Sequence, residues 1–241
     1  MQKRLLEPDV ICCNAVMSAL AKGEQWQTAL RVLSEMLWQH MEPDVISYNV
    51  AMSSCGKSGQ WRQALRLLAE MWQRQVDPDV TSYSTAISAC RKSKQWQHVV
   101  EILREMLQLH LEPNVISYNA AISAFEHAER WQQALAQFAE MRKWQLEADV
   151  VTFSACISAC DKGKQWQQAV GILSAMRQLL VEPTVITYST AISACEKVGH
   201  WQHALGILMQ MHYQQAEPNT ITYNAAISAC EKGKQWRQAL G

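Results

Sequence analysis

The chain has 241 residues, and its 22 Lys and Arg balance its 22 Asp and Glu, so the formal net charge is zero. A neutral chain has no global field that attracts nucleic acid, a membrane surface or an acidic substrate, so any electrostatic contact must come from where the charges sit. The sequence has no run of about 18 apolar residues, which argues against a membrane-spanning segment. Met1–Asp9 lacks the apolar core of a signal peptide, which argues against that signal.

A repeat of 35 residues organises the whole chain, because sliding the sequence by that step brings like residues onto like. Proline recurs at Pro8, Pro43, Pro78, Pro113, Pro183 and Pro218, and Ala148 fills the one gap. Tryptophan keeps the same step at Trp26, Trp61, Trp96, Trp131, Trp166, Trp201 and Trp236. A single fixed period of this length indicates a solenoid whose units contact only their neighbours.

The repeat predicts one continuous array and its boundaries. We expect residues 1–9 to be the tail of a preceding repeat and residues 10–241 to form a single solenoid. The repeats are 10–44, 45–79, 80–114, 115–149, 150–184, 185–219 and a partial one at 220–241. Terminal units of such arrays normally carry polar caps, and both ends here are cut inside a repeat, so we expect a fragment of a longer array.

Each repeat is predicted to hold two antiparallel helices. In the repeat from 115, apolar residues three and four apart line the first helix, namely Val115, Tyr118, Ile122 and Phe125. In the next repeat a polar, glycine-containing break at residues 162–164 is followed by the second stripe, which is Trp166, Ala169, Val170, Leu173 and Met176. The expected fold is all-α, a right-handed α-α superhelix of helical hairpins.

The cysteines occupy one place in the repeat at Cys55, Cys90, Cys160, Cys195 and Cys230. Equivalent points on stacked helices lie roughly 8–10 Å apart, whereas a disulfide needs Cα atoms closer than about 7 Å. We therefore interpret these residues as small core side chains in a reducing compartment.

The repeat carries a family resemblance in three short patterns. V-I-S-Y-N opens it at Val45–Asn49, L-x-x-M lies in its second helix at Leu68–Met71, and P-D closes it at Pro78–Asp79. A 35-residue hairpin with these patterns resembles the pentatricopeptide repeat family. It fits the tetratricopeptide pattern less well, because that period is 34 and its tryptophan lies early in the first helix. The resemblance covers essentially the whole chain and implies binding of single-stranded RNA, one base per repeat.

Two places in the repeat vary while their surroundings stay the same. The fifth residue is Asn14, Asn49, Ser84, Asn119, Ser154, Ser189 or Asn224, and the last is Asp44, Asp79, Asn114, Asp149, Thr184 or Asn219. Short polar side chains of these types can address the Watson–Crick edge of an unstacked base. The alternative is that the last residue is only a helix N-cap. Co-variation favours base reading, because Asn pairs with Asp three times and Ser with Asn or Thr three times.

The family's code, carried over pair by pair, implies a target sequence. It implies uracil for Asn14 with Asp44, for Asn49 with Asp79 and for Asn119 with Asp149. It implies adenine for Ser84 with Asn114 and for Ser189 with Asn219. Ser154 with Thr184 departs from the common pairs and suggests only a purine, while Asn224 lacks its partner and suggests a pyrimidine. With the first repeat on the 5′ side, the implied site is 5′-UUAURAY-3′.

Two further columns complete the predicted interface. The second residue of each repeat is implied to pack against the base, at Ile11, Ile46, Thr81, Ile116, Val151, Ile186 and Ile221; the alternative is ordinary packing at a helix edge. Lysine recurs at Lys22, Lys57, Lys92, Lys162, Lys197 and Lys232. These lysines either complement the helix dipole or neutralise successive phosphates. Six phosphate contacts predict a slope of about −4 for log affinity against log salt.

Other residues are assigned to architecture. We expect the tryptophan column, and the methionines Met36, Met71, Met106, Met141, Met176 and Met211, to be core. Trp38, Trp72 and Trp144 break the period and are expected at the surface. His200 with His203 and Cys156 with Cys160 offer two ligands each, whereas a structural zinc site needs four, so no metal or cofactor is predicted. No phosphate loop or nucleophile motif appears, so we predict no enzymatic activity.

The competing functions require different side chains on the binding surface of the solenoid. A protein-binding scaffold of tetratricopeptide type would want large or charged anchor residues, whereas the variable positions here are small. A third possibility is the targeting half of an RNA-processing enzyme, whose catalytic domain would lie beyond Gly241. We expect a monomer with single-stranded RNA as partner, no membrane contact, and RNA-processing proteins as possible partners. The resemblance suggests a mitochondrion or chloroplast.

Overall fold

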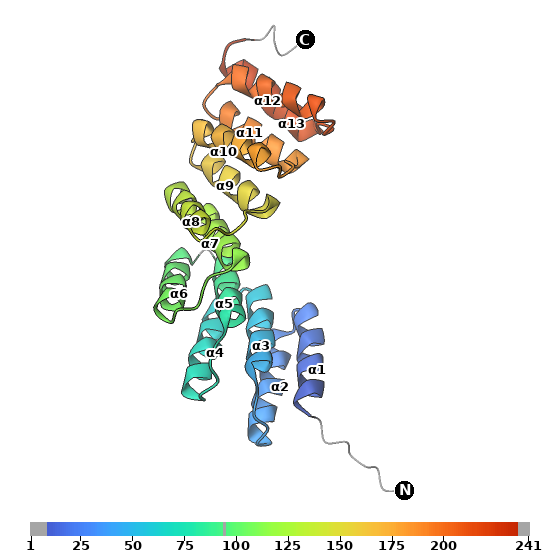
Figure 1. Ribbon diagram of the computed structural model, residues 1–241. Helices are drawn as coiled ribbons and strands as arrows, with labels where there is room; N and C mark the ends of the chain where they lie inside the picture. Colours follow the sequence, from blue (N-terminus) through green and yellow to red (C-terminus); the bar gives the residue numbers. More distant parts are fainter. Residues whose placement is uncertain (1–8, 94, 236–241) are drawn as a thin grey trace. The chain divides into compact units, whose positions relative to one another are not determined.

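The computed structural model describes residues 9–93 and 95–235, and within them every regular element is an α-helix (Figure 1). The helices are α1 (Val10–Lys22), α2 (Trp26–Trp38), α3 (Val45–Lys57), α4 (Trp61–Gln73), α5 (Val80–Lys92), α6 (Trp96–Gln108), α7 (Val115–His127), α8 (Trp131–Lys143), α9 (Val150–Lys162), α10 (Trp166–Gln178), α11 (Val185–Glu196), α12 (Trp201–Tyr213) and α13 (Thr220–Lys232). The predicted all-α class is confirmed.

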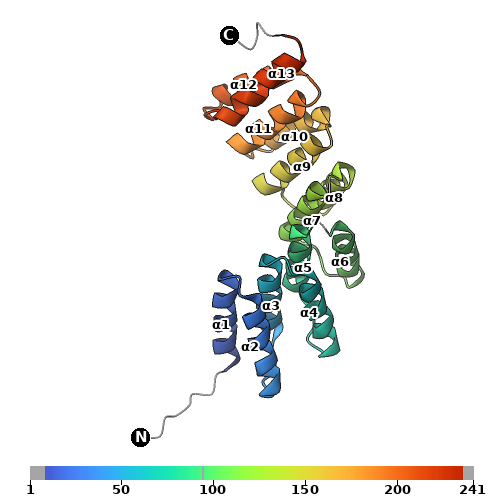
Figure 2. The same cartoon turned by 180° about the vertical axis from the view of Figure 1, so that it is seen from behind.

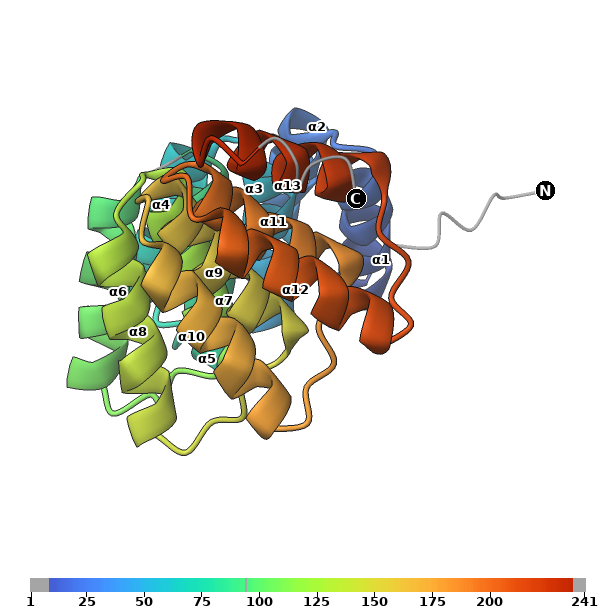
Figure 3. The ribbon, with the colours of Figure 1, turned by 90° about the horizontal axis from the view of Figure 1, so that it is seen from above.

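Contacts divide the chain into two compact units, residues 1–124 and 125–241. In the first unit the odd-numbered helices α1, α3 and α5 pack side by side, and in the second α9, α11 and α13 do the same. Each even-numbered helix α2, α4, α10 and α12 packs on its hairpin partner and on the next odd-numbered helix. The pairing can be followed from behind and from above (Figures 2 and 3). Each unit is therefore a stack of helical hairpins with a core between two helix layers.

The odd-numbered helices begin where the sequence supplies an N-cap. Asp44 has an extended backbone, and its carboxylate accepts a hydrogen bond of 2.8 Å from the backbone N–H of Ser47. The Ser47 hydroxyl in turn accepts from the Asp44 N–H at 3.3 Å, which completes a capping box. Capping boxes at Asp79, Asp149 and Thr184 start α5, α9 and α11, and simpler side-chain caps at Asp9 and Asn219 start α1 and α13. A cap of this kind stabilises a helix by about 1 kcal/mol.

The core is made of columns of equivalent side chains. The methionines of the second helices, Met36, Met71, Met106, Met141, Met176 and Met211, are fully buried, which confirms their prediction as core. Tyr83 is buried under α6 and donates a 2.8 Å hydrogen bond to Glu105. Burial raises the pKa of the Cys55 thiol to about 11 and that of Cys90 to about 12. All eight cysteines are free thiols, and the periodic ones are buried as predicted.

The tryptophan column lies at the junction between consecutive hairpins. Trp26 and Trp61 are half-buried and pack on the core of the first unit. In the second unit the indole of Trp131 covers Gly163, and that of Trp201 covers Gly233, so closely that a Cβ on either glycine would collide with the ring. Trp236 lies outside the described residues. Trp38, Trp72 and Trp144 are exposed, as predicted.

Gly163→Ala is expected to destabilise the second unit, because the new methyl group must displace the Trp131 indole. Overpacking of this type costs about 1–3 kcal/mol. Gly171→Ala, in the middle of α10, is the matched control, because a Cβ there meets nothing within 4 Å. That substitution should stabilise the helix by about 0.5–1 kcal/mol. Urea unfolding of both variants measures the difference, and equal shifts of the same sign would show that the indole does not fill this space.

Candidate nucleic-acid interface

The fifth residue of one repeat lies against the N-cap that closes it. The side-chain amide of Asn14, in α1, donates to the Asp44 carboxylate at 3.2 Å, and that of Asn49, in α3, donates to Asp79 at 3.4 Å. The Asp residues cap the next odd-numbered helix, which brings together side chains 30 residues apart in sequence. The capping role and the predicted pairing therefore coexist in one arrangement.

Serine at the fifth place makes a different contact. Ser84 shares a 2.7 Å hydrogen bond with the hydroxyl of Ser117, three residues after Asn114, and lies 3.5 Å from the Asn114 side-chain oxygen. In the second unit, Ser154 reaches Thr187 at 3.1 Å and Ser189 reaches Thr222 at 2.7 Å. Ser and Asn at the fifth place can therefore both contact the hydroxyl of the next odd-numbered helix and its capping residue, as Ser84 and Asn14 do.

The bridging hydroxyls were not predicted as site residues. They are the buried Ser47, Ser117, Thr187 and Thr222. The equivalent Ser82 and Thr152 bond to the capping Asp79 and Asp149. The Ser47 hydroxyl lies 2.7 Å from the Asn14 amide oxygen and 2.8 Å from the Asp44 carboxylate, so it fixes both side chains. The signal in the sequence was a Ser or Thr three residues after every capping residue except Asp9, which is a capping pattern.

Hydrogen bonding keeps the capping carboxylates ionised. Burial alone would raise the pKa of Asp44, but hydrogen bonds from Ser47 and Asn14 outweigh it and hold the pKa below its ordinary value. The same causes lower the pKa of Asp79, with Ser82 and Asn49 as donors. Both side chains are therefore pure acceptors at neutral pH, which suits a base edge that presents an N–H donor.

One atom of this arrangement has no protein partner. The amide oxygen of Asn49 is buried and makes no hydrogen bond with any residue in the described ranges. A buried polar atom without a partner costs about 1–3 kcal/mol. Replacing Asn49 by a smaller polar residue therefore removes an unfavourable feature of the free protein.

The second residue of each repeat is exposed, although it is apolar in every repeat but one. The exposed fractions of Ile11, Ile46, Ile116, Val151, Ile186 and Ile221 lie between 58% and 76%, and Thr81 is exposed as well. Ordinary packing at a helix edge would bury these side chains. Within each unit, their exposure leaves apolar side chains accessible, as a wall for a flat base would require.

Two grooves in the first unit gather the predicted residues. One, of about 470 Å³, runs over α1, α3 and α5, and its lining includes Lys22, Ile46, Asn49, Lys57, Asp79 and Thr81. The other, of about 310 Å³, runs over α3 and α5 to the start of α7, and its lining includes Lys57, Thr81, Ser84, Arg91, Asn114 and Ile116. The lining of each groove includes one predicted reading pair, two second-position side chains and cations. The fold thus assembles residues that the sequence places 30 or more positions apart.

The remaining predicted residues are placed as follows. Asn119 belongs to the first unit and Asp149 to the second, where Asp149 caps α9. Asn224 is exposed on α13. Lys162, Lys197 and Lys232 form ion pairs with carboxylates of the preceding repeat. The side chain of Lys92 lies outside the described residues.

The described residues were also searched for metal-binding clusters and membrane-spanning helices. His200 and His203 both pack against Trp166 with tilted rings, whose centroids lie 4.1 and 4.5 Å from that of the indole. No cluster of three or more His, Cys, Asp or Glu side chains that could hold a metal ion occurs among residues 9–93 and 95–235. None of the described helices combines the length and the apolar character that crossing a bilayer requires.

Models of one repeat family match several stretches of the chain. The model of the PPR repeat family matches residues 8–57, 43–92, 113–162 and 183–232, and a PPR repeat model matches residues 81–111. No curated protein matches the chain.

Solved structures share the fold at low sequence identity. The pentatricopeptide repeat protein PPR10 in complex with an 18-nt psaJ RNA element has a TM-score of 0.68 and 22% identity, over 97% of this chain and 33% of that one. PPR10 from maize has a TM-score of 0.55 and 19% sequence identity, over 96% of this chain and 43% of that one. The PPR domain of Arabidopsis thaliana protein-only RNase P 1, in complex with tRNA, has a TM-score of 0.62 and 15% sequence identity, over 72% of this chain and 91% of that one. The present chain thus spans about a third of the first PPR10 chain.

Proposed function

Because the chain belongs to the PPR repeat family, we propose that it binds single-stranded RNA and reads one base with each repeat. The observation that carries the proposal is the pair of grooves in the first unit, where reading pairs, exposed second-position side chains and cations line the same space. The matched structures of PPR10 with an RNA element and of a PPR domain with tRNA add support from proteins of the same fold.

The proposed target is 5′-UUAURAY-3′, read from the first repeat towards the last. Asn with Asp reads uracil, Ser with Asn reads adenine, Ser154 with Thr184 reads a purine, and Asn224 reads a pyrimidine. The base lies between the second-position side chains of consecutive repeats, such as Ile46 and Thr81. A capping Asp is an acceptor and selects a base edge that donates, whereas Asn can both donate and accept.

We assign the chain a binding role without catalysis of its own, in which a bound transcript is protected, processed or translated in a mitochondrion or chloroplast. A monomer is sufficient for this role, because each base needs only two successive repeats of one chain. RNA-processing proteins are the expected partners of the complex.

Enrichment of RNAs from a random pool by the purified chain tests the proposal. The expected result is a motif resembling UUAURAY, recovered from single-stranded RNA and not from the corresponding duplex. Failure to enrich any motif, together with partner-protein binding that survives removal of all RNA, would favour the protein-binding scaffold instead.

A further inference from the structure

The bridging hydroxyls lie between a reading side chain and the cap of the next odd-numbered helix. Their residues, Ser47, Ser117, Thr187 and Thr222, are fully buried. They contact the fifth residue of the preceding repeat at 2.7, 2.7, 3.1 and 2.7 Å, respectively. Because these hydroxyls are buried, a bound base does not touch them. Any influence on base recognition must therefore act through the reading side chain.

In the first repeat each proton of this network can be assigned. One oxygen of the Asp44 carboxylate accepts from the backbone N–H of Ser47 at 2.8 Å and from the side-chain amide of Asn14 at 3.2 Å. These two bonds occupy both lone pairs of that oxygen. The Ser47 hydroxyl lies 2.8 Å from the same oxygen and 2.7 Å from the amide oxygen of Asn14, so its single proton goes to the amide oxygen. Asn14 keeps one free amide proton and presents a donor to a base.

The serine pairs have the opposite polarity. Ser84 donates its only proton to the Val80 carbonyl oxygen at 2.7 Å. The 2.7 Å contact between the hydroxyls of Ser84 and Ser117 then requires Ser117 to donate. Ser84 keeps one lone pair and presents an acceptor to a base. Ser189 is held in the same way, by a carbonyl oxygen of its own helix at 2.8 Å and by Thr222 at 2.7 Å.

These polarities match the two bases that the pairs are proposed to read. Uracil presents an N–H donor beside carbonyl acceptors, which suits Asp44 as acceptor and Asn14 as donor. Adenine presents an amino donor beside a ring-nitrogen acceptor, which suits Ser84 as acceptor and the Asn114 amide as donor. The Asn114 side-chain oxygen already accepts from the backbone N–H of Ser117 at 2.9 Å, which turns its amide nitrogen away from the cap.

We propose that the bridging hydroxyl is a positioning residue for base selection, because it fixes whether the fifth residue of the preceding repeat donates or accepts. This inference rests on the proposed function and refines its base reading. Where the hydroxyl contacts the fifth residue, three side chains select the base: the two of the reading pair and the buried hydroxyl behind them.

The second repeat supplies an internal comparison. Asn49 and Asp79 are the same residue types as Asn14 and Asp44, and Ser82 makes the same capping contacts with Asp79, at 2.8 and 2.9 Å. The Asn49 amide oxygen, however, has no hydrogen-bond partner among the described residues. Its amide nitrogen is 3.4 Å from the Asp79 carboxylate, so this reading amide is held more loosely. The parent chain should therefore prefer uracil over guanine about fivefold less strongly at the second base than at the first.

Affinities of the full chain for single-stranded RNAs that differ from the proposed target only at the first or only at the second base test this inference. Ser47→Ala should lower the preference for uracil over guanine at the first base about fivefold. The freed Asn14 oxygen can then turn to accept from guanine, whose edge carries two adjacent donors. The preference at the second base should change by less than about twofold, because Asn49 does not contact Ser47.

Two further variants separate positioning from capping. Ser47→Thr keeps the hydroxyl, as Thr187 and Thr222 do, and should restore the parent preference to within about twofold. Ser82→Ala removes the matched capping hydroxyl without taking a bond from Asn49, so the preference at the second base should change by at most about twofold. A residue that only capped the helix would alter affinity for all four bases by the same factor.

Circular dichroism shows whether each variant is folded, and the comparison of the two bases in the parent chain needs no substitution. Equal preference for uracil at the first and second bases of the parent would overturn the inference. So would a uniform loss of affinity in Ser47→Ala, or an equally large loss of preference in Ser82→Ala, while RNA binding stands. A parent chain that binds no RNA would overturn the proposed function itself.

Discussion

The double variant Asn49→Ser with Asp79→Asn is expected to change the preferred second base of the site from uracil to adenine. The exchange reproduces the arrangement of Ser84 with Asn114 in the neighbouring repeat. It replaces a pure acceptor by an amide that both donates and accepts. A base edge left without its hydrogen bonds costs about 1–3 kcal/mol, so the parent preference should invert by about 5- to 150-fold in each direction. Affinities for RNAs that differ only at this base measure the effect.

The reciprocal exchange is the control for the first. Ser84→Asn with Asn114→Asp should change the preferred third base from adenine to uracil and leave the second base alone. Folding should be retained in both variants, because Asn is as good an N-cap as Asp, and Asn219 already caps α13. Removal of Asn49 also deletes a buried amide oxygen that has no partner among the described residues. If base preference follows neither exchange, the reading pairs are caps and nothing more.

Met211→Ala is expected to destabilise the second unit by about 2–5 kcal/mol. Met211 is fully buried in α12, which packs on both α11 and α13, so its removal leaves a cavity that the two helix layers cannot easily close. Because the units of a repeat array are stabilised by their neighbours, the loss should also loosen adjacent hairpins.

Met209→Ala in the same helix is the matched control. Met209 is 73% exposed, so the same substitution two residues away should change the free energy of unfolding by less than about 0.5 kcal/mol. Urea unfolding monitored by circular dichroism compares the two variants directly. Similar losses at both positions would mean that α12 does not bury the face described here.

Periodicity made much of the fold predictable. A 35-residue step places Met211 in one column with five other methionines, and all six are buried. The N-caps were also visible in sequence, because an Asp, Asn or Thr follows the proline, or Ala148 in its place, before each odd-numbered helix. Local patterns of this kind depend on residues three or four apart, which a helix brings onto one face whatever surrounds it.

Some contacts could not be read from the same columns. The bridging hydroxyls, such as Ser47, bond to Asn14 across 33 residues, and the sequence analysis treated the two variable places as a pair without a mediator. The packing of Trp131 over Gly163 depends on how one hairpin lies on the next. Neither contact can be predicted from the 35-residue period alone, because each depends on the distance between neighbouring helices.

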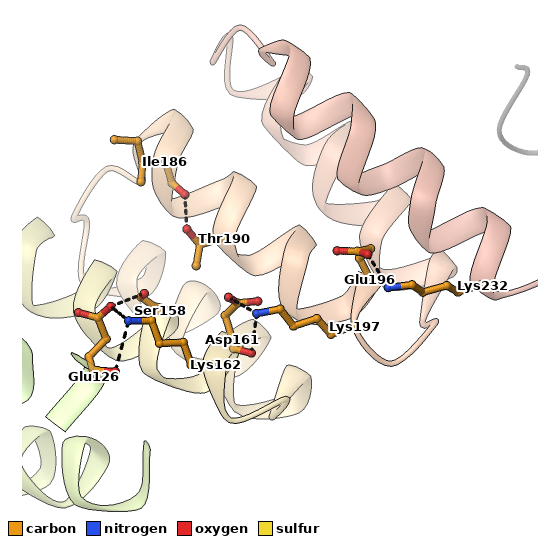
Figure 4. A network of polar contacts seen from close by, with 9 residues as sticks. All are labelled: Glu126, Ser158, Asp161, Lys162, Ile186, Thr190, Glu196, Lys197 and Lys232. Atoms are coloured by element: carbon orange, nitrogen blue, oxygen red, sulfur yellow. Dashed lines mark hydrogen bonds and ion pairs between the residues drawn. The ribbon is translucent and has the colours of Figure 1, made fainter. Parts of the chain in front are cut away.

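The lysine column shows the division most clearly. The sequence by itself determined the helical repeat, the buried columns and the places where small polar side chains vary. Only the tertiary structure decided that Lys162 and Lys197 form ion pairs with carboxylates 36 residues earlier in the chain (Figure 4). Ion pairing depends on distance and burial across neighbouring helices, which the place of a lysine in the repeat does not specify.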